Sequence, residues 1–173
     1  MTRLLTLAAL VAVALASTAN ATARFSPCTG KQLAGTFDVV KGSAGAGNIV
    51  YELVLKNVSH SQCTVTGLPQ GRLLGKNGKP LPTHVRAAFP GALTAVLVRL
   101  APGHKTYASA RFSPDVPGPG EPTAGRNCEL KSWWFLVAGQ GGGTTRVKMT
   151  PATPVCEHGQ LQFSSYGTTR QIP

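Results

Sequence analysis

The sequence predicts an all-β protein, an antiparallel β-sandwich of about seven to nine strands with two disulfides. Three observations predict it. Apolar and polar residues alternate in several short stretches, Gly and Pro turn signals separate these stretches, and no apolar pattern of helical period and adequate length follows the first 23 residues. A closed barrel would show the same strands and turns, and it stays open as an alternative at this point.

The clearest strand covers residues 48–57, where alternate residues form an apolar face that includes Tyr51. We expect this face to point into the core. In the stretch 105–112 the inward residues are mostly small, which leaves room for a facing sheet. The other predicted strands are 36–40, 63–68, 94–100, 130–138, 144–149 and 160–166.

Three connections between the strands stand out. Asn77 and Gly78 form the pair that type I′ hairpins prefer, because both central residues of that turn need a positive φ. Residues 87–92 form an apolar loop that we expect to cover one end of the sandwich. Residues 113–125 form a long, Pro-rich connection, which is expected to follow a stiff, extended path as the crossover of a Greek key.

The first 23 residues predict a secretory signal peptide. Arg3 gives a positive start, residues 4–16 are an apolar run interrupted only by Thr6, and a small-residue stretch allows cleavage near Ala21 or Ala23. No second apolar stretch of about 18 residues follows, so no transmembrane segment is expected in the mature chain. The remaining residues 24–173 are expected to form one exported domain.

Export changes the interpretation of the four cysteines, because in an oxidising compartment an even count usually means disulfides. Three connectivities are possible. We favour Cys28 with Cys63 and Cys128 with Cys156, since each pair closes a separate loop of about 30 residues. A lipid anchor on Cys28 is not expected, because residues 25–27 are not the small-residue box of a lipoprotein signal.

The chain is strongly basic, with 17 Lys and Arg against 6 Asp and Glu, a net charge of +11. No acidic residue occurs between Leu53 and Pro114. A field of one sign favours polyanions, whereas bases spread over several strands and turns point in several directions. The candidate polyanion contacts are Arg72, Lys76, Lys79 and Arg86.

Most catalytic motifs are missing from the sequence. It has no nucleophile elbow, no phosphate-binding loop and no zinc-protease motif. Met149 is the only methionine after the leader, which excludes a methionine-rich copper site. The histidines are scattered, and each is expected to be a solvated turn residue: His60, His84, His104 and His158.

One set of side chains keeps open a metal-dependent enzyme as a further alternative. If Cys128 and Cys156 are bridged, Glu129, Glu157 and His158 come near one another and could hold a divalent cation. The competing interpretation is that all three are ordinary exposed residues beside a disulfide. We predict no cofactor.

Aromatic residues on the strand 130–138 offer a possible contact surface. Trp134 points to the opposite face from Trp133 and Phe135, so one face fills the core and the other can carry a surface aromatic. An exposed indole can stack on a sugar or anchor a partner, although core packing is the commoner role. Asn57, in the sequon Asn57-Val-Ser59, is expected to be part of a turn and not a glycosylation site.

The order of several short motifs resembles a family of exported bacterial proteins, common in actinobacteria and catalogued as a domain of unknown function. The matching residues are Leu53, Leu55, Asn57 and Ser59; Cys63, Thr64, Gly67 and Pro69; Leu100, Pro102 and Gly103; Cys128 and Cys156. The resemblance extends from Cys28 to about Tyr166. It implies an immunoglobulin-like β-sandwich with disulfides, agrees with the pairing favoured above and supplies no catalytic residue.

These observations together predict a secreted, non-catalytic binding module that acts at the cell envelope or outside it. The expected partner is a protein or an envelope polymer, and the expected working surfaces are the loops 72–86 and 113–125. The chain is expected to be a monomer. The alternatives are a polyanion-binding protein that uses the acid-free middle and the metal-dependent enzyme.

Overall fold

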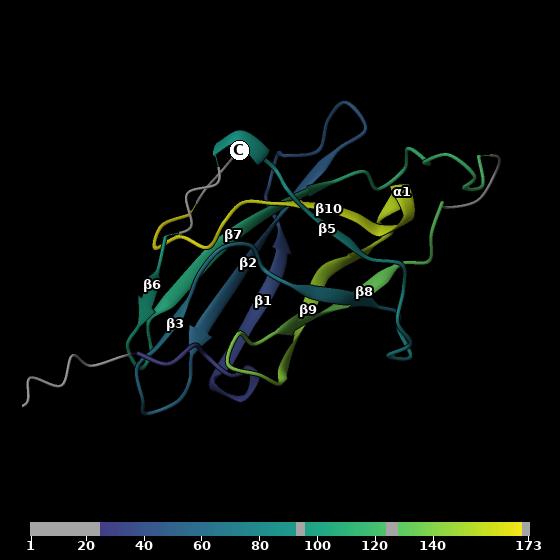
Figure 1. Cartoon of the computed structure of the whole chain (residues 1–173). Coiled ribbons are helices and arrows are strands. Elements are labelled where there is room, and N and C mark those ends of the chain that lie inside the picture. The colour runs from purple at the N-terminus through teal and green to yellow at the C-terminus, as the bar shows by residue number, and fades with distance from the viewer. Residues whose placement is uncertain (1–24, 93–95, 124–127, 171–173) are drawn as a thin grey trace, which may run out of the picture.

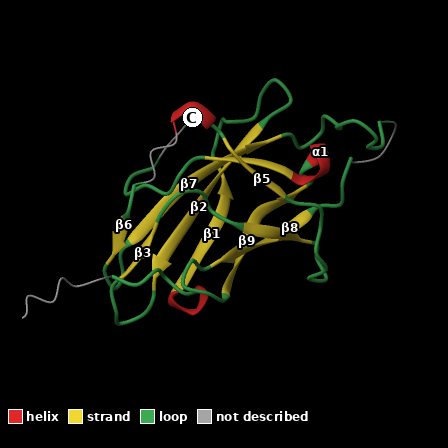
Figure 2. Ribbon diagram, viewed as in Figure 1, coloured by secondary structure: helices red, strands yellow, loops and turns green. Residues whose placement is uncertain are grey.

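A computed structural model describes residues 25–92, 96–123 and 128–170. The predicted signal peptide and its cleavage sites lie outside the described residues. The strands are β1 (Leu33–Val39), β2 (Ile49–Asn57), β3 (Cys63–Val65), β4 (Gly71–Leu74), β5 (His84–Ala87), β6 (Val98–Leu100), β7 (Lys105–Phe112), β8 (Ser132–Ala138), β9 (Thr144–Thr153) and β10 (Gln160–Phe163). Helical turns are short: η1 (Gly30–Gln32), η2 (Pro90–Ala92) and α1 (Cys156–Gly159). The described part of the chain is thus almost entirely strand and loop (Figure 2).

Eight strands form one sheet in the order β4-β8-β9-β1-β2-β7-β10-β5. The sheet curls until it is nearly closed into a barrel, and the small β3–β6 pair lies at the end away from α1 (Figure 1). Closure comes from one chain segment that supplies both outer strands. The Leu81 N–H donates to the Leu73 carbonyl at 2.9 Å, and the Leu73 N–H donates to Thr83 Oγ1 at 2.8 Å, so the segment folds back on β4 before entering β5.

This architecture differs from the predicted antiparallel sandwich in two ways. One curled eight-stranded sheet, with the small β3–β6 pair beside it, replaces two stacked sheets. Two pairs of the large sheet are parallel, β1 with β9 and β5 with β10. The residue alternation is the same in a sandwich and in a curled sheet, because each strand buries only one face in both. The pairing of distant strands decides between them.

The strand positions follow the alternation closely where strands are long. Tyr51, Leu53 and Leu55 on β2 are fully buried, and Ala108 and Ala110 face them from β7, as the alternation predicts. The structure adds the four-residue strands β4 and β5 inside the segment expected to be a loop. Each is short and lies beside prolines, which removes the periodic signal on which strand prediction depends.

The core is an aromatic cluster inside the curled sheet. Phe37 contacts three other rings, with centroid separations of 5.4 Å to Tyr51, 5.6 Å to Phe135 and 5.9 Å to Phe163. The hydroxyl of Tyr51 donates to the Pro151 carbonyl at 2.8 Å, which satisfies the one polar atom of this ring.

The hairpin between β4 and residue 80 is present, but its turn is not of type I′. Only Gly78 has a positive φ, of 78°, while Asn77 does not. The Gly78 N–H donates to the Gly75 carbonyl, and the Gly75 N–H donates to the Lys79 carbonyl, both at 2.9 Å. This pattern is a three-residue loop in which the glycine takes the left-handed position, the next commonest hairpin geometry.

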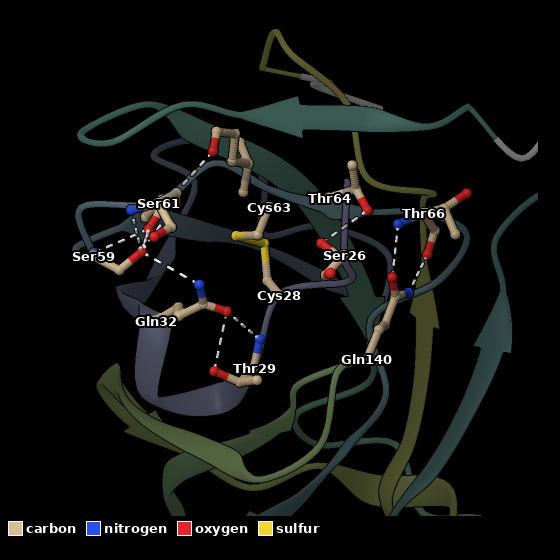
Figure 3. The surroundings of a disulfide bond; sticks show 12 residues. Ser26, Cys28, Thr29, Gln32, Ser59, Ser61, Cys63, Thr64, Thr66 and Gln140 are labelled. Atoms are coloured by element: carbon tan, nitrogen blue, oxygen red, sulfur yellow. Dashed lines mark hydrogen bonds between the residues drawn. A yellow bond between two sulfur atoms is a disulfide. The ribbon is translucent and has the colours of Figure 1, made fainter. Parts of the chain in front are cut away.

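The predicted disulfides are both formed, Cys28 with Cys63 and Cys128 with Cys156. The first lies beside η1, whose N-terminal end is capped by Thr29 together with Gln32 (Figure 3). Gln32 Oε1 accepts from the Thr29 N–H at 2.8 Å, which ties the residue after Cys28 to this turn.

Asn57 occupies a buried site at the end of β2 and uses its whole amide. Nδ2 donates to the carbonyls of Ser61 and Leu100, each at 2.8 Å, while Oδ1 accepts from the Ser59 N–H at 3.0 Å and from its hydroxyl at 2.7 Å. The side chain is 0% exposed. The sequon is therefore a structural turn, as expected, and its amide is not accessible to a glycosyl transferase.

No helix in the described ranges has the length and apolar character needed to cross a membrane.

Candidate functional site

A surface hollow of about 690 Å³ lies between the hairpin 75–81 and the residues that lead into β8. We call it the Trp133 groove. Its lining combines one indole, apolar side chains and three lysines: Trp133, Leu81, Leu130, Lys76, Lys79 and Lys131. Leu130 is 72% exposed, so the apolar part of this lining is not covered by the rest of the described chain. Volume and lining are those of a ligand site.

A break in strand pairing positions Trp133. Ser132 pairs with Thr153, but Trp134 pairs with Lys148, so residues 149–152 form an excursion of β9 opposite one residue of β8. A second hollow of about 290 Å³ opens here, and it shares Trp133 and Lys131 with the groove. Alternation alone would bury Trp133 beside Phe135, whereas the break leaves it half-buried at the surface.

Trp134, on the opposite face of β8, is not an open contact surface. The guanidinium carbon of Arg146 on β9 lies 4.0 Å from the centroid of its ring, which is a cation–π contact between neighbouring strands. Trp133 is the indole that lines the two hollows, and Trp134 lines neither of them. Alternation predicted that one face of this strand can carry a surface aromatic, without deciding between the two indoles.

Charge in the groove is of one sign. No acidic residue of the described part of the chain lines either hollow, and Lys76 Nζ lies 5.5 Å from the centroid of the Trp133 ring. Of the four candidate polyanion contacts, the hairpin brings Lys76 and Lys79 together here. Arg72 on β4 and Arg86 on β5 do not line the groove.

Sequence reasoning missed Lys131 and Leu130. Both lie just before Ser132 and the aromatic pair, at the edge of the predicted strand 130–138. The sequence signal that could have indicated this site is Lys131, a basic residue two positions before Trp133. Nothing in the local sequence shows that the hairpin 75–81 packs beside it, because that contact depends on the pairing of β4 with β8.

A second candidate is the carboxylate and imidazole group beside the Cys128–Cys156 disulfide. The structure brings Glu129 and His158 together, with ligand atoms within 4.8 Å of one another, but the third member is Glu121 and not Glu157. Glu157 Oε2 instead accepts from Gln160 Nε2 at 2.7 Å. Glu121 comes from the long loop, which sequence reasoning did not place here.

Glu121 already has partners in the backbone. Its Oε2 accepts from the N–H groups of Gly118 at 2.7 Å and Glu157 at 2.9 Å, and its Oε1 accepts from the His158 N–H. Burial alone would raise the pKa of the Glu121 carboxyl, but these donors outweigh it and hold the pKa below its ordinary value of 4.5. The carboxylate thus fixes the loop to the turn α1.

Glu129 and His158 complete this anchor. Burial raises the pKa of the Glu129 carboxyl, and the nearby charge of Glu121 adds to the shift. His158 Nε2 lies 2.9 Å from the Pro119 carbonyl oxygen, so the imidazole also contacts the loop. Three backbone donors give the Glu121 carboxylate a structural role.

The remaining histidines are apart from both candidates. His60, His84 and His104 are exposed, as is His158. His84 lies on β5 and not in a turn, since this strand was not predicted. No two of the three lie in a cluster with other metal-ligating side chains among the described residues.

A third hollow, of about 660 Å³, lies over the outer faces of β1, β2 and β7. Its lining has both signs of charge, including Asp38 and Lys105. Arg170 occupies part of it, with Nη1 3.4 Å from Glu52 Oε2 and its guanidinium over the ring of Tyr107. The C-terminal segment thus uses this face internally, which makes it a weaker candidate than the Trp133 groove.

Comparison with known proteins identifies the family. The model of a domain of unknown function, DUF4232, matches residues 28–166. The chain belongs to the DUF4232 family. The match begins at Cys28 and includes the remaining three cysteines, so both disulfides lie within the DUF4232 domain. No curated protein and no solved structure matches this DUF4232 chain.

Proposed function

We propose that this DUF4232 domain is a secreted, non-catalytic binding module that acts at the cell envelope or outside it, and that the Trp133 groove is its binding surface. The observation that carries the proposal is the apolar and aromatic lining of the groove, which has three positively charged lysines beside it. A partly exposed indole with uncovered leucine beside it is the kind of surface that anchors a partner.

Two features support export. The chain has two disulfides and, among the described residues, no free cysteine. Disulfides of this kind persist in oxidising compartments and are rare in the cytosol. The apolar run 4–16 with its small-residue cleavage stretch agrees with them, because it has the composition of a signal peptide.

The test is retention of the purified mature chain on cell envelope isolated from its own organism, at low and at high salt. Wild type, Trp133→Ala and the double variant Arg72→Gln/Arg86→Gln are compared. The double variant is the matched control, because it removes two exposed positive charges outside the groove. We expect wild type and the control to stay bound at high salt and Trp133→Ala to be released. Equal retention of all three would contradict the assignment of the groove.

A second candidate function is non-specific polyanion binding by the basic middle of the chain. The observation that favours it is Lys56 lying directly opposite Lys105 in the β2–β7 pair, a like-charge arrangement that a bound anion would relieve. This binding would be lost at high salt and would be insensitive to Trp133→Ala. The same experiment therefore separates the two functions.

A further inference from the structure

We propose that the Trp133 groove and the second hollow form one track for an acidic polysaccharide, with a sugar ring on the Trp133 indole and uronate carboxylates against the flanking lysines. This inference rests on the proposed function, because it names the ligand class of the same surface. It says which polymer chemistry the lining recognises.

The two hollows are neighbours that share lining residues at Trp133. The groove has a volume of about 690 Å³ and the second hollow about 290 Å³, and Trp133 and Lys131 line both. The indole therefore lies between two spaces and not at the end of one. A ligand that uses both must extend across the ring, which suits a chain of sugar units better than a single small molecule.

Positive charge continues along the whole track. Lys76 and Lys79 lie on one side of Trp133, Lys131 is shared, and Lys148 lines the second hollow. All four are exposed, and the ion pairs found among the described residues involve none of them. These four ammonium groups take part in none of those ion pairs, and no carboxylate of a described residue lines the track, so the surface is complementary to a polymer with a repeating negative charge.

The side chains favour a glycan over a nucleic acid. Among the described residues, a single aromatic ring lines the track, whereas single-stranded nucleic acids are held by successive rings that stack successive bases. No arginine of the described ranges lines it either, and arginine is the residue whose planar fork matches phosphate oxygens in pairs. Lysines act as point charges, which suits spaced carboxylates. The apolar side chains of Leu81 and Leu130 extend the surface that the face of a sugar ring contacts.

The experiment measures binding of polygalacturonate by isothermal titration calorimetry, with dextran as the neutral glycan and single-stranded poly(dT) as the nucleic acid. We expect polygalacturonate to bind and the other two to bind at least about tenfold more weakly. Trp133→Ala should weaken polygalacturonate binding by about tenfold, and Trp133→Phe, which keeps a ring, should restore most of it.

Charge is tested with a matched pair of double variants. Lys79→Gln/Lys131→Gln removes two charges from the track, and Lys56→Gln/Lys105→Gln removes two from the outer face of β2 and β7. We expect only the first to weaken binding, and more strongly at low salt than at high salt. Far-UV circular dichroism and the urea midpoint of each variant check that the fold is intact.

Three results would overturn the inference: tighter binding of poly(dT), equal binding of dextran, or no effect of Trp133→Ala on polygalacturonate. Failure of this inference is distinguishable from failure of the proposed function. If Trp133→Ala is released from the envelope but polygalacturonate does not bind, the surface is right and the ligand class is wrong. If neither measurement responds to Trp133→Ala, both are wrong.

Discussion

The buried amide of Asn57 allows the sharpest test of the packing argument. Asn57→Ala leaves the Leu100 carbonyl without its donor in a buried position, while the partners at Ser59 and Ser61 lie nearer the surface and can turn to water. Orphaning one buried carbonyl costs about 1–3 kcal/mol, and the other lost hydrogen bonds add about 1 kcal/mol. We therefore expect Asn57→Ala to lower the free energy of unfolding by about 3 kcal/mol.

Asn57→Asp has nearly the same shape and should be worse at neutral pH. It places a carboxylate oxygen against the carbonyl oxygens of Ser61 and Leu100, where the amide nitrogen now donates to both. Burial and these acceptors would raise the pKa of the introduced carboxyl above its unfolded value of about 3.9. A raised acid pKa means that the variant regains stability as the pH falls through the folded pKa toward the unfolded one.

The assay is urea unfolding with the disulfides intact, followed by circular dichroism. With an m-value of about 2 kcal/mol/M, Asn57→Ala should lower the midpoint by about 1.5 M. Asn77→Ala is the control, because Asn77 is exposed and its one bond, from the Lys79 N–H at 3.1 Å, lies in a surface turn. A loss below about 1 kcal/mol for Asn57→Ala, or equal stability of the Ala and Asp variants at pH 7, would refute the reasoning.

Three further predictions concern the backbone, the loop anchor and a disulfide. Gly159→Ala should lower the free energy of unfolding, measured in urea, by at least about 2 kcal/mol more than Gly42→Ala does. Both glycines have a positive φ, but only at Gly159 would an added Cβ meet a backbone atom, 1.9 Å from the Pro82 carbonyl oxygen. Glu121→Gln should destabilise the protein above pH 4.5. The loss in free energy of unfolding should become smaller as the pH falls through the lowered pKa of Glu121, because protonation then weakens the same interactions in wild type. A loss that does not change with pH would contradict this. Cys28→Ser/Cys63→Ser should cost about 3–4 kcal/mol from the entropy of a loop with a sequence separation of 35, measured by the same unfolding, and an unchanged midpoint would be the opposing result.

Local patterns predicted what depends on neighbouring residues. The buried faces of β2 and β7 follow from alternation, because a strand with one buried face must place every second residue inward. Both disulfides followed from the separate loops that each pair closes. The turn at Asn57 was also recognised, although its role in holding β2 to β6 needed the contact with Leu100.

Features that depend on distant pairing were missed for a common physical reason. The four-residue strands β4 and β5 are stabilised by β8 and β10, and nothing within 71–87 shows those partners. The same pairing places the hairpin 75–81 beside Trp133 and so creates the groove. The carboxylate cluster contains Glu121 where the sequence predicted Glu157, and the reason is similar. Backbone N–H groups do not show in a residue pattern, but they are the hydrogen-bond donors that hold the Glu121 carboxylate in place.

The segment that supplies both outer strands also has a consequence for folding kinetics. Gly71 on β4 pairs with Val137 on β8, and His84 on β5 pairs with Gln160 on β10. Both outer strands of the sheet can therefore pair only after residues synthesised much later are available. Closing such long loops is entropically expensive, and proteins dominated by distant pairings fold slowly. A nascent chain that ends before β8 has β4 and β5 without their sheet partners. The Trp133 groove can therefore form only after β8 has been synthesised and has paired with β4.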